Sequence, residues 1–316
     1  MRNKKELFIG FIFFISCINV FAEEAIKPLP QTIKINQQKA NLGQRLFFDP
    51  RLSKDNSVSC ATCHDLSQGG ANHNKLSIGI YNQVGSVNVP TVYNSSFNFR
   101  QFWNGRAANL QQQAYGPVTN PKEMAGNWPD VITKLENDPS YEQMFLNVYG
   151  GQITPDNITD AISEYEKSLV TPSRFDDYLR GNQNALTPEE KRGYQLFKFY
   201  GCAQCHGGVN IGGDMFAQMG IFHNYFKDRG GPTTDADSGL YQITKKECDR
   251  YVFKIPSLRN VGITAPYMHD GSVKTLYQAV YVMGYYELGI KIPPQDIKAI
   301  VAFLNSLTGK SLEQNK

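Results

Sequence analysis

Apolar residues recur at intervals of three and four along several segments of this chain, which is the spacing of amphipathic helices packed on one face. The clearest segments are 158–169, 276–283 and 294–307. A further helix is predicted to begin at Pro188, because Thr187 can cap it and Glu190 completes a Thr-x-x-Glu capping box. Segments 207–213 and 227–239 are rich in Gly, Asp and Thr and are predicted to be loops. Strand-like alternation is rare and short, so the pattern predicts a mainly α-helical fold with long loops and little β-structure.

The two halves of the chain share a local pattern. Residues 43–47 and 193–197 both read Gly-x-x-Leu-Phe, and each stretch leads into a similar cysteine motif. Polar residues interrupt the helical pattern at 174–185, so we place a domain boundary there. This divides the chain into an N-terminal domain, 23–177, and a C-terminal domain, 178–316. The repetition predicts two related units, each with a helix running toward its motif.

The cysteine motif is Cys-x-x-Cys-His, and it occurs twice. The copies are Cys60-Ala61-Thr62-Cys63-His64 and Cys202-Ala203-Gln204-Cys205-His206. The pattern is typical of covalent haem c attachment, in which both thiols form thioethers and the histidine binds the iron. A zinc site built from the four cysteines, or a pair of redox-active dithiols, would not require a histidine after both pairs. With only 5 His in 316 residues, its presence at both positions favours two haem groups.

The N-terminus predicts export. Arg2, Lys4 and Lys5 precede an apolar run at 7–20, and cleavage is expected after Ala22. The run is too short to favour a membrane span. Bacterial haem attachment to thiols also takes place outside the cytoplasm. We therefore predict a signal peptide at 1–22, periplasmic localisation and no membrane span in the mature chain.

Composition narrows the partners and leaves one cysteine to explain. Lys and Arg total 32 against 29 Asp and Glu, so there is no basic excess to suggest a nucleic-acid partner. Of the 6 cysteines, four belong to the motifs and Cys17 lies in the predicted signal peptide. Cys248 is predicted to be a buried small hydrophobe, with a reactive thiol or an intermolecular disulfide as the alternatives.

Several blocks besides the motifs resemble the bacterial di-haem cytochrome c peroxidases over nearly all of the mature chain. They are 88–94, 102–107, 116–117 with 120–124, 256–261, 265–271 and 302–309. The resemblance implies two cytochrome c-like haem domains. The N-terminal haem would be the peroxidatic site and the C-terminal haem the electron-transfer site.

For the electron-transfer haem, the resemblance implies His206 and Met283 as the axial iron ligands. A thioether ligand raises the reduction potential, so this haem would be the more easily reduced of the two. From the residues alone Met283 would be interpreted as a core methionine. Met215, Met219 and Met268 are then alternative ligands.

For the peroxidatic haem, the resemblance implies catalytic roles for Glu123 and Gln113. A carboxylate can move a proton from the inner to the outer peroxide oxygen, and an amide can orient the bound peroxide. The same resemblance places Trp103 between the two haems, where an indole assists electron transfer. Without the resemblance, Glu123 would be interpreted as a surface residue at the start of a helix, and Trp103 as a side chain that only packs against its aromatic neighbours.

A calcium site between the haems is also implied by the resemblance. Its protein ligands would be Asn88 and the backbone carbonyls of Thr264 and Pro266. Hard oxygen donors suit Ca²⁺. No acidic cluster in the sequence suggests this site independently.

The chain departs from the family at one position. Many members carry a distal histidine sixteen residues after the proximal one, and here that residue is Ile80. Isoleucine cannot bind iron, so we predict an open peroxidatic haem that reacts without prior reduction. A substitute ligand is the alternative, either His73 or Tyr81.

The sequence therefore predicts a periplasmic peroxidase that reduces hydrogen peroxide to water. Its electron donor would be a small periplasmic cytochrome c or cupredoxin, and a homodimer is left open. One rival function is a non-catalytic di-haem electron carrier. Another is a di-haem oxidase that modifies a partner protein, which Met283 disfavours because the related maturation enzymes carry tyrosine there.

Overall fold

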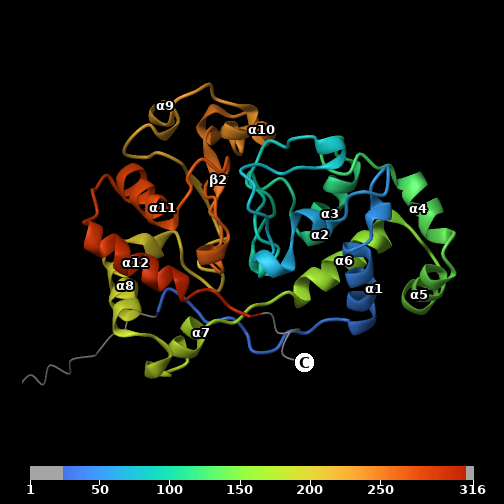
Figure 1. The fold of residues 1–316 in the computed structure, drawn as a ribbon, viewed down its shortest axis with the longest axis horizontal. Helices are drawn as coiled ribbons and strands as arrows, with labels where there is room; N and C mark the ends of the chain where they lie inside the picture. Colours follow the sequence, from blue (N-terminus) through green and yellow to red (C-terminus); the bar gives the residue numbers. More distant parts are fainter. Residues whose placement is uncertain (1–23, 311–316) are drawn as a thin grey trace, which may run out of the picture.

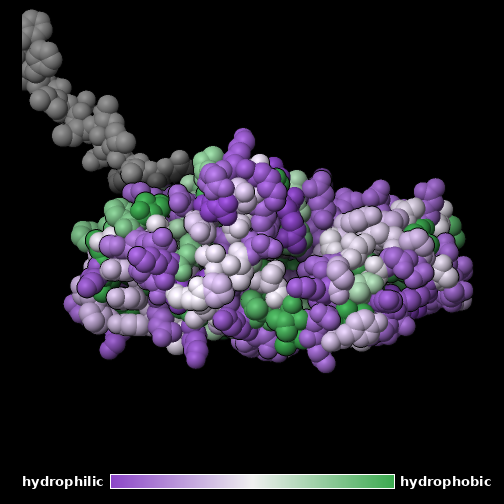
Figure 2. Space-filling view, turned by 90° about the horizontal axis from the view of Figure 1, so that it is seen from above, coloured by the Kyte–Doolittle hydropathy of each residue, from purple (hydrophilic) through white to green (hydrophobic). Residues whose placement is uncertain are grey.

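Two helical lobes lie side by side in the computed structural model, which describes residues 24–310 (Figure 1). The predicted signal peptide lies outside the described residues. The predicted mainly α-helical fold is confirmed, with one two-stranded antiparallel sheet in the described part of the chain. Between residues 24 and 310, no helix combines the length and the apolar character needed to cross a membrane. The surface seen from above is mostly hydrophilic, with hydrophobic side chains in separate groups (Figure 2).

The regular elements follow the chain in this order. The α-helices are α1 (Gln37–Phe47), α2 (Cys60–Cys63), α3 (Leu110–Thr119), α4 (Trp128–Glu136), α5 (Pro139–Tyr149), α6 (Pro155–Ser168), α7 (Arg174–Leu179), α8 (Pro188–Phe199), α9 (Tyr225–Arg229), α10 (Tyr241–Thr244), α11 (Leu276–Val282) and α12 (Pro294–Asn305). The strands are β1 (Phe216–Gln218) and β2 (Val252–Lys254). The short 3-10 turns used below are η6 (Cys202–Gln204), η7 (Asp235–Ser238) and η8 (Glu247–Asp249), and a π-helical turn, η10 (Met283–Glu287), continues α11.

Each lobe is built on a close crossing of its first and last helices. In the first lobe α1 crosses α6, and a Cβ at Gly43 would lie 1.8 Å from the carbonyl oxygen of Ala161. In the second lobe α8 crosses α12, and a Cβ at Gly193 would lie 1.9 Å from the carbonyl oxygen of Ala299. Only glycine permits so close a backbone approach. The predicted relation between the two units is therefore confirmed at the level of helix packing.

Two segments expected to interrupt the helical pattern contain short helices. Helix α7 lies in the predicted boundary region, while α9 ends within the predicted loop at 227–239 and η7 lies inside it. The Ser173 N–H and hydroxyl both donate to Asp176 Oδ2, at 2.8 and 2.9 Å. The Thr234 N–H donates in the same way to Asp237. These reciprocal caps stabilise short turns that a polar composition does not reveal.

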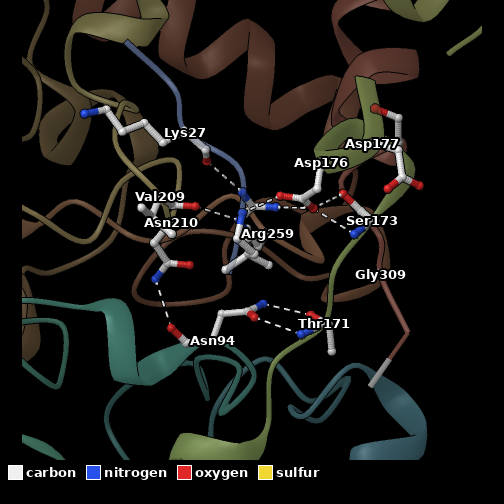
Figure 3. Close-up of polar contacts among 12 residues, drawn as sticks. Lys27, Asn94, Thr171, Ser173, Asp176, Asp177, Val209, Asn210, Arg259 and Gly309 are labelled. Carbon is white, nitrogen blue, oxygen red and sulfur yellow. Dashed lines mark hydrogen bonds and ion pairs between the residues drawn. The ribbon is translucent and has the colours of Figure 1, made fainter. Parts of the chain in front are cut away.

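A fully buried ion pair ties the N-terminal arm to the second lobe (Figure 3). Arg259 Nη1 lies 2.9 Å from Asp176 Oδ2, and both side chains are 0% exposed. The Arg259 guanidinium also donates to the carbonyl oxygens of Val209, at 2.8 Å, and Lys27, at 3.3 Å. The Leu29 N–H donates to Asp176 Oδ1 at 2.7 Å. The arm before α1 is thus fixed against α7 and the second motif's loop.

A second buried network joins the two lobes. Asn94 and Asn260 both adopt the left-handed backbone conformation, with φ of 59° and 61°. Their side-chain amides donate to the same hydroxyl, Thr171 Oγ1, each at 2.8 Å. The amide of Asn210 donates to the Asn94 carbonyl at 3.2 Å (Figure 3). Asn94 of the first lobe and Asn260 of the second lobe are therefore joined through the same Thr171 hydroxyl.

The lobes also exchange backbone hydrogen bonds across their interface. The Asn88 N–H donates to the His269 carbonyl at 2.8 Å, and the Lys254 N–H donates to the Trp103 carbonyl at 2.9 Å. The offset along the chain from Asn88 to Lys254 equals that from Trp103 to His269. These two contacts are therefore pseudo-symmetric counterparts, and Trp103 and His269 occupy equivalent positions.

Candidate functional site

The first motif presents its histidine in a fixed orientation. Helix α2 begins after Ser59, whose N–H donates to Thr62 Oγ1 at 3.0 Å. His64 follows the helix directly, and its Nδ1 lies 3.2 Å from the Gly70 carbonyl oxygen. Donation from Nδ1 leaves Nε2 free to bind a metal. Burial lowers the pKa of His64, which favours the neutral ring that a metal requires.

The second motif repeats this arrangement. His206 follows η6, and its Nδ1 lies 3.4 Å from the Ile211 carbonyl oxygen. Gly212 has a φ of +114°, and a Cβ there would lie 2.4 Å from the Pro256 carbonyl oxygen. Burial lowers the pKa of His206 to about 4, so its ring is neutral at neutral pH. Both histidines are thus buried, with Nδ1 next to a backbone carbonyl oxygen, which suits each of them to bind iron through Nε2.

The two alternative interpretations of the cysteines do not fit the structure. Within residues 24–310, Asp237, His269 and Asp270 form the one group of three His, Cys, Asp or Glu ligands close enough to share a metal. The four motif cysteines are therefore not gathered into a zinc site. Burial raises the pKa of Cys63 and Cys202 to about 11, which disfavours reactive thiolates at neutral pH.

A cavity of about 140 Å³ that opens to solvent adjoins the first motif. Cys60, Cys63 and His64 form one side of it. Gln113, from α3, and Glu123, from the loop after α3, also line it. The structure thus brings both predicted catalytic side chains to the predicted peroxidatic motif.

Buried oxygen atoms without a hydrogen-bond partner indicate that this cavity suits a ligand that carries polar groups. Ser95 Oγ and Glu166 Oε2 are buried and make no hydrogen bond, and both residues line the cavity. Buried polar atoms are normally hydrogen-bonded, so such atoms indicate a partner that the chain itself does not supply. The walls also include the apolar side chains of Leu110, Ala114 and Ile162. A haem, with its apolar faces and carboxylate edge, fits this combination.

Glu123 is half-buried, and two neighbours favour its carboxylate form. Burial raises its pKa, while the positive charge of Arg106 and a hydrogen bond from Asn120 oppose that increase. The Asn120 Nδ2 donates to Glu123 Oε1 at 2.7 Å. A carboxyl with a raised pKa is suited to accept and return a proton near neutral pH.

Ile80 packs in the hydrophobic core of the first lobe with 1% of its surface exposed, and it does not line the cavity. Its N–H donates to the Glu123 carbonyl at 2.8 Å. A Cβ at Gly79 would lie 2.2 Å from the Lys122 carbonyl oxygen, so the loop lies directly against the Glu123 segment. This loop therefore supports the backbone of Glu123.

Neither alternative distal ligand lines the cavity. His73 is exposed, and its Nδ1 lies 3.1 Å from the Ala265 carbonyl oxygen. Tyr81 is 60% exposed. In this conformation both side chains are directed elsewhere.

Trp103 lies beside a buried polar cluster that the sequence did not predict. Its Nε1 donates to the Asn88 carbonyl at 2.9 Å, and its ring centroid lies 6.4 Å from that of His269. His269 Nε2 lies 2.7 Å from Asp237 Oδ1, and Arg229 pairs with the same carboxylate at 2.8 Å. Burial alone would raise the pKa of Asp237, but these partners hold it well below its usual range. The Thr-x-x-Asp pattern at Asp237 indicates a capped turn, but no local signal indicates that Asp237 pairs with His269.

Met283 occupies the first position of the π-helical turn η10 and is half-buried. Single π-helical turns occur frequently at functional sites. Met219 and Met268 instead pack against an aromatic cluster, and Met215 is 40% exposed. Ligation by Met283 stays a prediction.

The expected calcium ligands lie in two neighbouring segments. The Asn88 Nδ2 donates to the carbonyl oxygens of Asn74, at 3.1 Å, and Lys75, at 3.3 Å. The contact from His73 to the Ala265 carbonyl holds the 264–266 segment beside this stretch. Neutral oxygen atoms are thus available, and the calcium site stays a prediction.

The expectation for Cys248 was wrong. This thiol is exposed, and it lies in η8 on the surface. Glu247 and Arg250 flank it and form an ion pair at 2.7 Å. Charged neighbours on both sides keep this short turn in solvent.

Comparisons with known proteins agree with the geometry. A family model described as di-haem cytochrome c peroxidase matches residues 37–184. A family model described as cytochrome c matches residues 190–308.

Two curated relatives are similar along most of the chain. Cytochrome c peroxidase Ccp of Escherichia coli is 50% identical over 288 residues, covering 90% of this chain and 61% of the relative. Cytochrome c551 peroxidase of Nitrosomonas europaea is 46% identical over 290 residues, covering 91% of this chain and 85% of the relative. The chain thus spans less than two thirds of the first relative and most of the second.

A solved structure has the same architecture. The crystal structure of a MauG-like protein associated with microbial copper homeostasis superposes with a TM-score of 0.78 at 27% sequence identity. The match covers 93% of this chain and 96% of that protein.

Proposed function

Since this chain belongs to the di-haem cytochrome c peroxidase family, we propose that it reduces hydrogen peroxide to water with electrons from a small redox protein. The observation that carries the proposal is that His64, Gln113 and Glu123 line one cavity. Each turnover would consume two electrons and two protons and release two water molecules. When bound, the haem iron at His64 would supply electrons and the position at which the peroxide O–O bond breaks.

Glu123 would act as the proton-transfer group. Its carboxylate takes the proton from the inner peroxide oxygen and delivers it to the outer one, so that the outer oxygen leaves as water. The raised pKa of Glu123 suits both halves of this transfer. The amide of Gln113, on α3, would hold the peroxide in the orientation that the transfer needs.

Electrons would enter at the second motif, where His206 and Met283 would hold the iron. Trp103 would assist their passage to the first motif. Its indole lies at the interface of the lobes, with the N–H fixed to the Asn88 carbonyl. We further propose a periplasmic location, a small cytochrome c or cupredoxin as donor, and Ca²⁺ bound by Asn88, Thr264 and Pro266.

Replacement of Glu123 tests the peroxidase function. Glu123→Gln should lower peroxide turnover at least 100-fold, because the amide cannot carry the proton. Both haems should remain reducible by dithionite, since no ligand is changed. Turnover is measured by oxidation of a reduced small cytochrome c.

Glu142→Gln, on the exposed side of α5, is the matched control and should retain full turnover. Unchanged turnover in Glu123→Gln would remove Glu123 from the mechanism. A wild-type protein that reduces and reoxidises without consuming peroxide would instead identify the rival, a non-catalytic electron carrier.

Ile80 leads to a second proposal, that the peroxidatic haem is open in the fully oxidised protein. Ile80 is in the core, and His73 and Tyr81 do not line the cavity. We expect a substantial high-spin ferric signal by electron paramagnetic resonance, and peroxide consumption without prior reduction. Two low-spin ferric species alone, with a lag that one-electron reduction abolishes, would contradict an open site.

A further inference from the structure

Lys254, the last residue of β2, is 7% exposed. Among the residues that the structure describes, its ammonium has neither a hydrogen-bond acceptor nor a carboxylate partner. Burial lowers the pKa of Lys254 to about 8. A lysine side chain with so little exposed surface seldom lacks an anionic partner, so the site requires an explanation outside the protein's own contacts.

The strand directs the Lys254 side chain away from the buried polar cluster of His269, Asp237 and Arg229. The ring of the preceding residue, Phe253, lies 4.6 Å from that of His269, on the side where Asp237 also lies. Successive side chains of a strand point to opposite faces. The ammonium therefore faces the other side, where it has no acidic partner.

Pseudo-symmetry shows what lies on that side. Asn88 and Lys254 are equivalent, because each donates its N–H across the interface to equivalent carbonyls. Two residues later, Pro90 and Pro256 each present a carbonyl to the ring of their own motif's histidine. Asn88 and Pro90 both line the cavity of the first motif. Lys254 should therefore border the corresponding haem site of the second motif.

A haem carries two carboxylate side chains, which are anions that the Lys254 ammonium can pair with. We propose that Lys254 forms an ion pair with a carboxylate of the haem held by Cys202, Cys205 and His206. The positive charge disfavours the ferric state of that haem relative to the ferrous state. Lys254 is thus a positioning residue that raises the reduction potential of the electron-entry site.

This inference depends on haem attachment at the second motif and not on the peroxidase activity. Its test is a spectroelectrochemical titration of the holoprotein, which resolves the two haems. In Lys254→Met the higher potential should fall, with the equilibrium constant for reduction about tenfold smaller, or about 59 mV. Lys254→Arg should restore most of that loss, because it keeps the charge.

Lys274→Met, at an exposed position, is the matched control and should leave both potentials unchanged. Lys254→Gln is a second neutral variant in case the methionine variant does not fold. A higher potential that stays unchanged in both neutral variants would overturn the proposal. So would a change confined to the lower-potential haem.

Discussion

Glu123 is subject to influences that act on its pKa in opposite directions. Burial raises the pKa, and Arg106 and Asn120 oppose the increase. Because the carboxylate form would accept the peroxide proton in the proposed mechanism, turnover should fall as the pH drops through this raised pKa. The position of the acid limb of the pH profile therefore reports the environment of Glu123.

Asn120→Ala should move that acid limb to higher pH. The substitution removes the 2.7 Å hydrogen bond that favours the carboxylate, so the pKa of Glu123 rises further. We expect a several-fold loss of turnover on the acid side and little change well above the limb. Asn147→Ala, on the exposed face of α5, serves as the control. An acid limb that stays in place or moves to lower pH would show that Asn120 does not set this pKa.

At the scale of residues, the sequence predicted the roles of side chains that belong to a local sequence motif. The histidine after each cysteine pair predicts the proximal ligands, and the resemblance pointed to Glu123 and Gln113, which line the same cavity as His64. It could not predict the pairing of His269 with Asp237, because that contact joins two loops 32 positions apart. Nor could it show that Lys254 is buried without a partner, since lysine is almost always a surface residue.

At the scale of elements, the helix crossings give the most direct prediction. Gly43→Ala places a methyl group against the Ala161 carbonyl, so α1 and α6 must separate. The free energy of unfolding should fall by about 1–3 kcal/mol, measured by denaturant titration of the holoprotein.

Gly116→Ala, within α3, is the matched helical control. Its Cβ would meet only Phe102, at an ordinary 3.7 Å. Because alanine is the better helix former, this variant should be neutral or more stable by up to about 1 kcal/mol. Equal effects of the two substitutions would mean that the α1–α6 contact does not depend on glycine.

The elements that were predicted correctly carry complete local signals. Helix α8 begins where Thr187, Pro188 and Glu190 indicated, with the capping box in place. Helices α6, α11 and α12 follow the apolar spacing. Helix α7 and η7 were missed because each is a short capped segment in polar sequence, too short for any periodicity to appear.

At the scale of the whole molecule, the buried Arg259–Asp176 pair links three distant parts of the chain. Asp176→Asn leaves the guanidinium buried without a counter-charge, which typically costs about 3–5 kcal/mol of stability. Thermal or denaturant unfolding of the holoprotein measures this loss. Glu247→Gln, in the exposed pair with Arg250, should change stability little. Similar small effects from both variants would show that the buried pair does not hold the arm and the lobes together.

The interface between the lobes has a further consequence. Asn88 and Lys254 each donate a backbone hydrogen bond to the opposite lobe, on either side of the contact between Trp103 and His269. A hinge between the lobes would have to break both bonds at once. In the proposed mechanism, the distance that an electron would cross is therefore fixed in the folded chain, and the transfer would not require one lobe to move against the other.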